Sequence, residues 1–208
     1  MARDTQSIVK MSRREGYALH PKAHKALVKR STMPGEQATS GGRGRRNKPS
    51  QYSIQLREKQ KVKRLYGLLE RQFAKLMSEA SRSKGKSGAK LLEFLELRLD
   101  NVIYRSGLAV SRRAARQLVT HGHFMLNGRR VDIPSIRVVT GDAIIVRERS
   151  KSTDYFKRLE DVSPAPAAIP DWLNVNRKKC EVKITGVPSR DDAEPDIKEQ
   201  LIVEYYSR

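Results

Sequence analysis

The sequence predicts an α+β protein: a mainly helical domain with an Arg-rich N-terminal extension, a small α-helix/β-sheet module and a C-terminal tail that packs back. Two observations support this fold class. From Ile54 to Met77, apolar residues recur mostly at spacings near three and four, the period of one helix face. Beyond residue 120, short strand-like runs are separated by turn signals such as Asn127-Gly128, which is typical of a hairpin.

The N-terminal segment is predicted to be an extension without its own core. Residues 1–48 show little hydrophobic periodicity, and residues 31–50 are rich in Gly, Ser, Pro and Arg. Such a composition buries too little apolar area to offset the entropy of ordering. We therefore expect a basic extension that is mobile alone and becomes ordered on a polyanion.

A helical domain is expected over residues 49–96. Ser50 or Ser53 is a candidate N-cap for its first helix. Gly67 interrupts the apolar stripe, which favours two helices over one. A turn-like segment at residues 83–88 precedes a further apolar-rich helix.

The next module, residues 97–160, is expected to contain two helices followed by a short antiparallel sheet. Ser111 precedes a run with one apolar face and Gly122 follows it, so the second helix lies between them. The hairpin around Asn127-Gly128 comes next. A further strand pair is expected at residues 136–139 and 143–146.

The C-terminal tail, residues 161–208, begins with a Pro/Ala-rich linker at residues 163–170. It contains strand patterns at residues 181–184 and 201–205 but too few apolar residues for a core of its own. We expect the tail to pack on the helical domain.

The formal net charge of +20 is unevenly distributed. Residues 1–64 hold 17 basic and 4 acidic residues, whereas residues 97–150 contain ten Arg, no Lys and four acidic residues. A positive charge of this size and distribution indicates a polyanionic partner. Guanidinium groups bind phosphate bidentately and stack on bases. Because Phe124 is the one aromatic residue on the module's predicted strands, recognition of RNA shape and backbone is favoured over stacking of single strands.

Several other classes of protein find no support in the sequence. There is no Gly-rich nucleotide-binding loop and no apolar stretch near the ~20 residues of a membrane span, and no secretory signal is expected. The single Cys180 excludes an internal disulfide and fits a reducing compartment, so a cytoplasmic location is expected. His20 and His24 are too few for a closed zinc site, and no metal or other cofactor is expected.

Asp100 is the one candidate catalytic carboxylate, because Arg98-Leu99-Asp100 resembles the sequence around the nucleophile of pseudouridine synthases. The chain lacks the large catalytic sheet domain of those enzymes, so we interpret Asp100 as a salt-bridging residue on a helix. His121 and His123 are interpreted as surface or RNA-facing polar side chains.

Six segments together resemble one known family over essentially the whole chain. They are MSRREG at 11–16, SIQLREKQKVKRLYG at 53–67, LERQF at 69–73, RLDNVIYR at 98–105, SRRAARQLV at 111–119 and EQLIVEYYSR at 199–208. These segments resemble the bacterial small-subunit ribosomal protein S-four family. Many members carry four N-terminal cysteines that bind zinc; this sequence has none there and resembles the zinc-free form.

The resemblance implies a non-enzymatic, structural component of the small ribosomal subunit, located in that subunit. Such a protein is a primary binder of ribosomal RNA that nucleates assembly of the subunit body. The resemblance also implies a contribution to translational accuracy, a place in the channel through which messenger RNA enters, and contacts with the neighbouring proteins S-five and S-three. Residues 97–160 correspond to the RNA-binding module of the S-four type. The alternatives are an RNA-modifying enzyme using Asp100 and a non-ribosomal RNA chaperone built around the same module.

The candidate RNA-binding residues lie in all three basic regions, and no catalytic or metal-binding residue is expected. They are Arg13, Arg14, Arg43, Arg45, Arg46 and Lys48 in the extension; Tyr52, Arg57, Lys59, Lys61, Lys63, Arg64 and Arg71 in the helical domain; and Arg105, Ser111, Arg112, Arg113, Arg116, Arg129 and Arg130 in the module. By position, the resemblance makes Arg43, Arg45, Arg46 and Lys48 the candidates for the messenger RNA channel.

Overall fold

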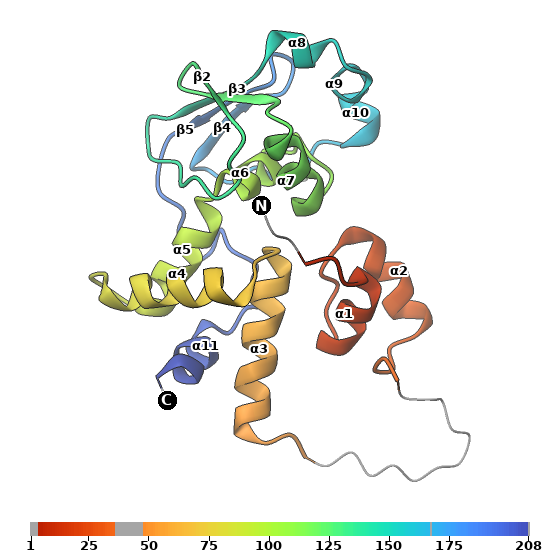
Figure 1. Ribbon diagram of the computed structural model, residues 1–208, viewed down its shortest axis with the longest axis vertical. Helices are drawn as coiled ribbons and strands as arrows, with labels where there is room; N and C mark the ends of the chain where they lie inside the picture. Colours follow the sequence, from red (N-terminus) through yellow and green to blue (C-terminus); the bar gives the residue numbers. More distant parts are fainter. Residues whose placement is uncertain (1–3, 36–47, 167, 208) are drawn as a thin grey trace. The chain divides into compact units, whose positions relative to one another are not determined.

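The computed structural model describes residues 4–35, 48–166 and 168–207 (Figure 1). The chain divides into two compact units: Met1–Gly88 with Asp196–Arg208, and Ala89–Pro195. We refer to them as the helical unit and the sheet unit. The candidate residues Arg43, Arg45 and Arg46 lie outside the described residues.

The helical unit is built from helices only within its described residues. They are α1 (Ile8–Glu15), α2 (Pro21–Lys29), α3 (Gln51–Leu65), α4 (Glu70–Arg82) and α11 (Glu199–Tyr206). Ser50, one of the two expected caps, accepts a hydrogen bond from the Ser53 backbone N–H and begins α3. Gly67 follows α3 with a left-handed φ of 66°, so the expected break in the apolar stripe is confirmed.

The N-terminal extension contains folded structure that its composition did not predict. Helices α1 and α2 pack on each other, and α1 also contacts α3. Met11, Leu19 and Ala23 are buried there, a core too small to show as periodicity. His20 caps α2 by accepting from the Lys22 N–H, and Pro21 occupies the first helical position. The expectation that residues 1–48 lack a core of their own is therefore wrong for residues 8–29.

Helix α11 packs against α3, so the expected strand at residues 201–205 is wrong. Ile202 is buried and the rings of Tyr206 and Phe73 lie 6.3 Å apart. The spacing of apolar residues in a short run is compatible with a strand or with a buried helix. Here the segment is a helix because it packs against α3.

The sheet unit combines helices with one antiparallel sheet. Its helices are α6 (Leu99–Arg105), α7 (Arg112–Thr120), α8 (Glu148–Lys151), α9 (Asp154–Lys157) and α10 (Leu159–Val162), and its strands are β1 (Phe124–Leu126), β2 (Arg129–Val131), β3 (Ala143–Val146), β4 (Leu173–Asn176) and β5 (Glu181–Ile184). Helix α5 (Ser87–Glu96) crosses the boundary between the units. The five strands are ordered β2-β1-β3-β5-β4.

The hairpin predicted at Asn127-Gly128 is present. Both residues have positive φ, 49° and 79°, as a two-residue turn of this kind requires, and Leu126 pairs with Arg129 across it. Residues 136–139, expected as a strand, form only an isolated bridge between Arg137 and Arg98. Their backbone is bonded to the start of α6 instead: the Val138 N–H donates to the Leu97 carbonyl at 3.0 Å.

Much of the C-terminal segment belongs to the sheet unit and not to the helical unit. In Figure 1 the blue strands β4 and β5 extend the green sheet, although they lie far along the chain from β3. Val182 pairs with Ile144, and Trp172 and Ile184 join the core around Phe124. The expected packing of residues 161–208 on the helical domain therefore holds only for α11, because β5 completes the edge that β3 would otherwise expose.

The Pro/Ala-rich segment at 163–170 is tied to the body of the sheet unit at its start. Ser163 Oγ donates to the Gly107 carbonyl at 2.9 Å, and Arg177 donates to the same oxygen at 2.9 Å. Within the described residues, no helix is long and apolar enough to cross a membrane.

Candidate nucleic-acid interface

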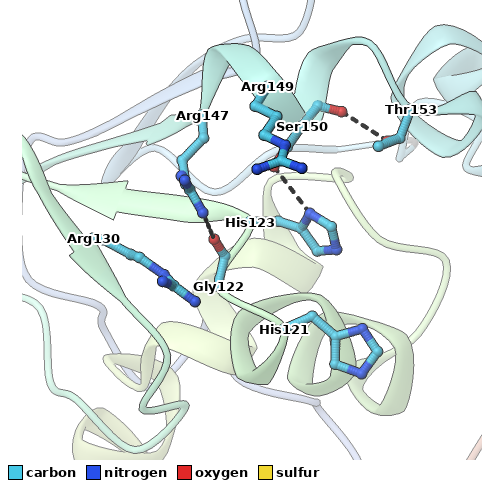
Figure 2. Close-up of a pocket in the computed structure, with 8 residues that line it drawn as sticks. All are labelled: His121, Gly122, His123, Arg130, Arg147, Arg149, Ser150 and Thr153. Atoms are coloured by element: carbon cyan, nitrogen blue, oxygen red, sulfur yellow. Dashed lines mark hydrogen bonds between the residues drawn. The ribbon is translucent and has the colours of Figure 1, made fainter.

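A basic pocket opens on the sheet unit where α7, the β1–β2 hairpin and the segment after β3 meet. Its volume is about 320 Å³. Figure 2 shows the lining side chains, which are those of His121, Gly122, His123, Arg130, Arg147, Arg149, Ser150 and Thr153. None of these eight residues is acidic, so three guanidinium groups share the pocket without a carboxylate in its lining.

Gly122 determines how the pocket is built. It follows the end of α7 with a φ of 72°, a conformation that residues with a side chain rarely adopt. A Cβ at this position would lie 2.7 Å from Nε of Arg130, so the Arg130 guanidinium lies directly over the glycine. Arg147 donates to the Gly122 carbonyl at 3.1 Å (Figure 2). The turn thus anchors the Arg147 guanidinium by a hydrogen bond and leaves room for the Arg130 guanidinium over the glycine.

His123 supports the pocket as a neutral side chain. Its Nδ1 lies 3.0 Å from Oγ of Ser150, and its ring meets Phe156 edge-on. Burial lowers the pKa of His123 below its ordinary value of 6.5, and the nearby His121 and Arg147 lower it further. The neutral imidazole therefore predominates at pH 7, and Arg130, Arg147 and Arg149 supply the positive charge.

The arrangement suits a phosphate group. Guanidinium groups present paired N–H donors that match phosphate oxygens and stay charged at any physiological pH. The pocket is open, so a phosphate carried on a long backbone can reach it. Arg129 and Arg130 are exposed on the sheet's edge strand β2, and Arg113 is exposed on α7. Arg129, the chain neighbour of the pocket residue Arg130, adds positive charge on β2, whereas Arg113 lies at the other end of α7 from His121 and Gly122.

Arg105, Arg112 and Arg116 are held by acidic and amide partners within the sheet unit. Arg105 donates to both carboxylate oxygens of Glu96, at 3.0 and 2.9 Å. Arg112 donates to Oδ1 of Asn101 at 2.8 Å, and Arg116 donates to Asp100 at 3.1 Å. All three were expected as direct RNA contacts. Arg112 and Arg116 thus join α7 to α6, and Arg105 joins α6 to the end of α5.

Ser111 and Asp100 have structural contacts as well. Ser111 is the N-cap of α7 and accepts from the Ala114 N–H at 3.2 Å. Asp100 is 5% exposed and accepts two hydrogen bonds from Arg98 and one from Arg116. A carboxylate occupied in this way is a salt-bridging residue, as the sequence favoured.

In the helical unit the expected RNA-binding residues fall into two groups. Seven lie in the first group, which forms internal contacts: Arg57 and Arg64 bind Glu15, Lys59 and Lys63 bind Glu70, Lys61 binds Glu58 and the Asp196 carbonyl, Arg13 binds the Thr32 carbonyl, and the Tyr52 ring lies 5.8 Å from that of Tyr205. Arg14, Lys48 and Arg71 form the second group and are exposed.

Sequence reasoning missed Arg147 and Arg149 as site residues and gave His121 and His123 no specific role. The signal was present: Arg147 and Arg149 are alternate residues directly after β3, within the module that has ten Arg and no Lys. Their convergence with Arg130 depends on the pairing of β1 with both β2 and β3. Within the described ranges, no group of three or more His, Cys, Asp or Glu residues could hold a metal ion.

The two-part fold and the basic surface define an α+β RNA-binding protein. Comparison with known proteins agrees: the model of the ribosomal protein S4/S9 N-terminal domain matches residues 3–96, and the model of the S4 domain matches residues 97–144. The chain is 50% identical to small ribosomal subunit protein uS4 of Clostridioides difficile (strain 630) and 49% identical to that of Herpetosiphon aurantiacus, with 100% of both chains covered in each case. The chain belongs to the uS4 family of small ribosomal subunit proteins.

Proposed function

We propose that the chain is a structural protein of the small ribosomal subunit and that the basic pocket with the β1–β2 hairpin is its main surface for ribosomal RNA. One observation supports this surface above all. Arg130, Arg147 and Arg149 converge on an open pocket whose lining has no acid, whereas Arg112 and Arg116 are bound to internal partners. An RNA backbone phosphate matches this pocket in charge and in hydrogen-bonding geometry.

The wider role in the ribosome is proposed from membership of the uS4 family. The chain nucleates assembly of the subunit body, contributes to translational accuracy and lines the channel through which messenger RNA enters. Its protein neighbours are S-five and S-three. In the channel, Arg43, Arg45, Arg46 and Lys48 contact the message; the exposed side chain of Lys48 is available for this role.

A catalytic role is disfavoured by the state of Asp100. Its carboxylate already accepts hydrogen bonds from Arg98 and Arg116, which leaves it poorly placed to attack a uridine. The uS4 relatives are ribosomal proteins over their whole length. A structural role accounts for both units, whereas a modifying enzyme would use only the module.

The test is the binding of the purified chain to small-subunit ribosomal RNA, with a footprint of the protected nucleotides. Arg130→Gln with Arg149→Gln is expected to weaken binding and to reduce the slope of log affinity against log salt by about 0.7–0.9 for each lost phosphate contact. Lys157→Gln with Arg158→Gln is the matched control, because it also removes two exposed positive charges from the sheet unit, outside the pocket.

Three results would each overturn the proposal or a part of it. If the chain gives no footprint, its role as an RNA-binding ribosomal protein is wrong. If the Arg130/Arg149 double variant and the Lys157/Arg158 double variant have equal affinities and salt slopes, the pocket is not the RNA surface. Isomerisation of uridine by the chain that Asp100→Ala abolishes would establish the enzyme instead.

A further inference from the structure

We propose that Glu194 occupies a second phosphate site, between Arg105 and Arg112, and that bound RNA displaces it. Oε1 of Glu194 lies 3.0 Å from Nη2 of Arg112 and 3.6 Å from Nη2 of Arg105. One carboxylate oxygen thus bridges two guanidinium groups, as a phosphate oxygen would. The inference rests on the proposed RNA binding and adds a site and its regulation to it.

Both arginines keep their positions when Glu194 leaves, because each has a second, more buried anchor. Arg105 is held by both oxygens of Glu96, whose side chain is 1% exposed. Arg112 is held by Asn101 at 2.8 Å and lies over the Tyr104 ring, 4.6 Å from its centroid. The two guanidinium groups are therefore preorganised for an anion.

Glu194 is the replaceable partner in this group. Its side chain is 23% exposed, against 1% for Glu96. Water therefore has more access to the Glu194 carboxylate than to that of Glu96, which weakens the net gain of the Glu194 ion pairs relative to that of Glu96. A phosphodiester carries the same single negative charge and can bind both arginines, so an exchange of partners leaves no charge unpaired on the arginines.

The position of the site also favours an anion. Arg112 is the first residue of α7, a helix of nine residues whose N-terminus carries a partial positive charge. Ala193, next to Glu194, is buried, so packing holds the backbone of this loop in place. Glu194 therefore leaves the site by rotation of its side chain, without movement of the whole loop.

The experiment compares Glu194→Gln with Asp191→Asn in binding to the same ribosomal RNA. Both changes remove one negative charge from the same loop, and Asp191 is exposed without an ion pair to the described residues. Glu194→Gln is expected to tighten binding about two- to fivefold, because the internal competitor is weakened. Asp191→Asn is expected to change affinity less than about 1.5-fold at physiological salt.

A double-mutant comparison identifies the arginine. In an Arg112→Gln background, Glu194→Gln is expected to give no gain beyond that of Asp191→Asn. If the wild-type chain binds no ribosomal RNA, the proposed function itself is wrong. If the wild-type chain binds but Glu194→Gln matches Asp191→Asn or weakens binding, only this inference is overturned, and Glu194 is a structural residue.

Discussion

Arg116 donates a hydrogen bond to the Asp100 carboxylate across the α6–α7 interface, at 3.1 Å. Arg98 donates to the same carboxylate at 3.1 and 2.8 Å. Asp100 is buried, and the two arginines compensate the negative charge of its carboxylate from two sides. The sequence predicts that Arg116 contacts RNA. In the structure its positive charge pairs with Asp100 and links α6 to α7.

Arg116→Gln is accordingly expected to change stability more than RNA binding. Loss of a charge-assisted hydrogen bond at a buried acceptor costs about 1–3 kcal/mol. Because Arg98 still neutralises Asp100, the lower part of that range is expected. Urea unfolding measures the stability, and a salt titration of RNA binding measures the phosphate contacts. A large fall in the salt slope with unchanged stability would contradict the structural role of Arg116.

Gly122→Ala is expected to affect both the fold and the pocket. The φ of 72° costs a residue with a side chain about 1–2 kcal/mol, and the new Cβ would meet the Arg130 guanidinium at 2.7 Å. We expect a lower unfolding temperature together with weaker RNA binding, because Arg130 must move. Gly141→Ala is the control: its φ is 96°, but its Cβ would meet nothing within 4 Å, and it lies outside the pocket lining and the β1–β2 hairpin. Equal effects of the two variants on RNA binding would contradict the role of Gly122 in placing Arg130.

The sequence predicts best what depends on neighbours along the chain. The Ser111 cap, the Asn127-Gly128 turn and the break at Gly67 are all confirmed, since caps and turns need only local backbone geometry. The strands at residues 173–184 could not be assigned to the correct unit, because that depends on the free edge of β3. Contact with α3 likewise decides the helix at 199–206.

The same limit applies to the candidate site. Arginine content predicts a basic surface, but the chain's own acids determine which arginines remain available. Glu15, Glu96, Asp100 and Glu194 each bind arginines that the sequence presents as candidates. These pairings join residues from 9 to 82 positions apart, so spacing along the chain does not reveal them.

Low pH is expected to destabilise the helical unit, because Glu70 becomes protonated. Burial acts to raise the pKa of this carboxyl, but hydrogen bonds from Lys59, Lys63 and Tyr206 outweigh it and lower the pKa to about 2. The ordinary value, 4.5, applies to the unfolded chain. Because the folded pKa is the lower one, the stabilisation is present above pH 4.5 and is lost as the pH falls towards 2.

Urea unfolding of the helical unit, followed from pH 7 to pH 2, tests this expectation. Glu70→Gln is expected to remove part of the acid dependence, and Tyr206→Phe a smaller part, because it deletes only one of the three hydrogen bonds. An identical acid dependence in wild type and Glu70→Gln would show that other carboxyls account for it.

Removal of residues 1–48 is expected to loosen α3, although their composition alone suggests little contribution to a core. The Glu15 side chain is fully buried and binds Arg57, at 3.3 Å, and Arg64, which lie two turns apart on α3. The deletion exposes both arginines and the part of α3 that packs on α1. Hydrogen exchange of α3 should therefore become faster, while exchange of β3 and β5 in the sheet unit provides the internal control. Glu15→Gln tests the ion pairs alone and should give a smaller change in the same direction. If the backbone amides of α3 exchange at the wild-type rate in the shortened chain, α1 contacts α3 without stabilising it.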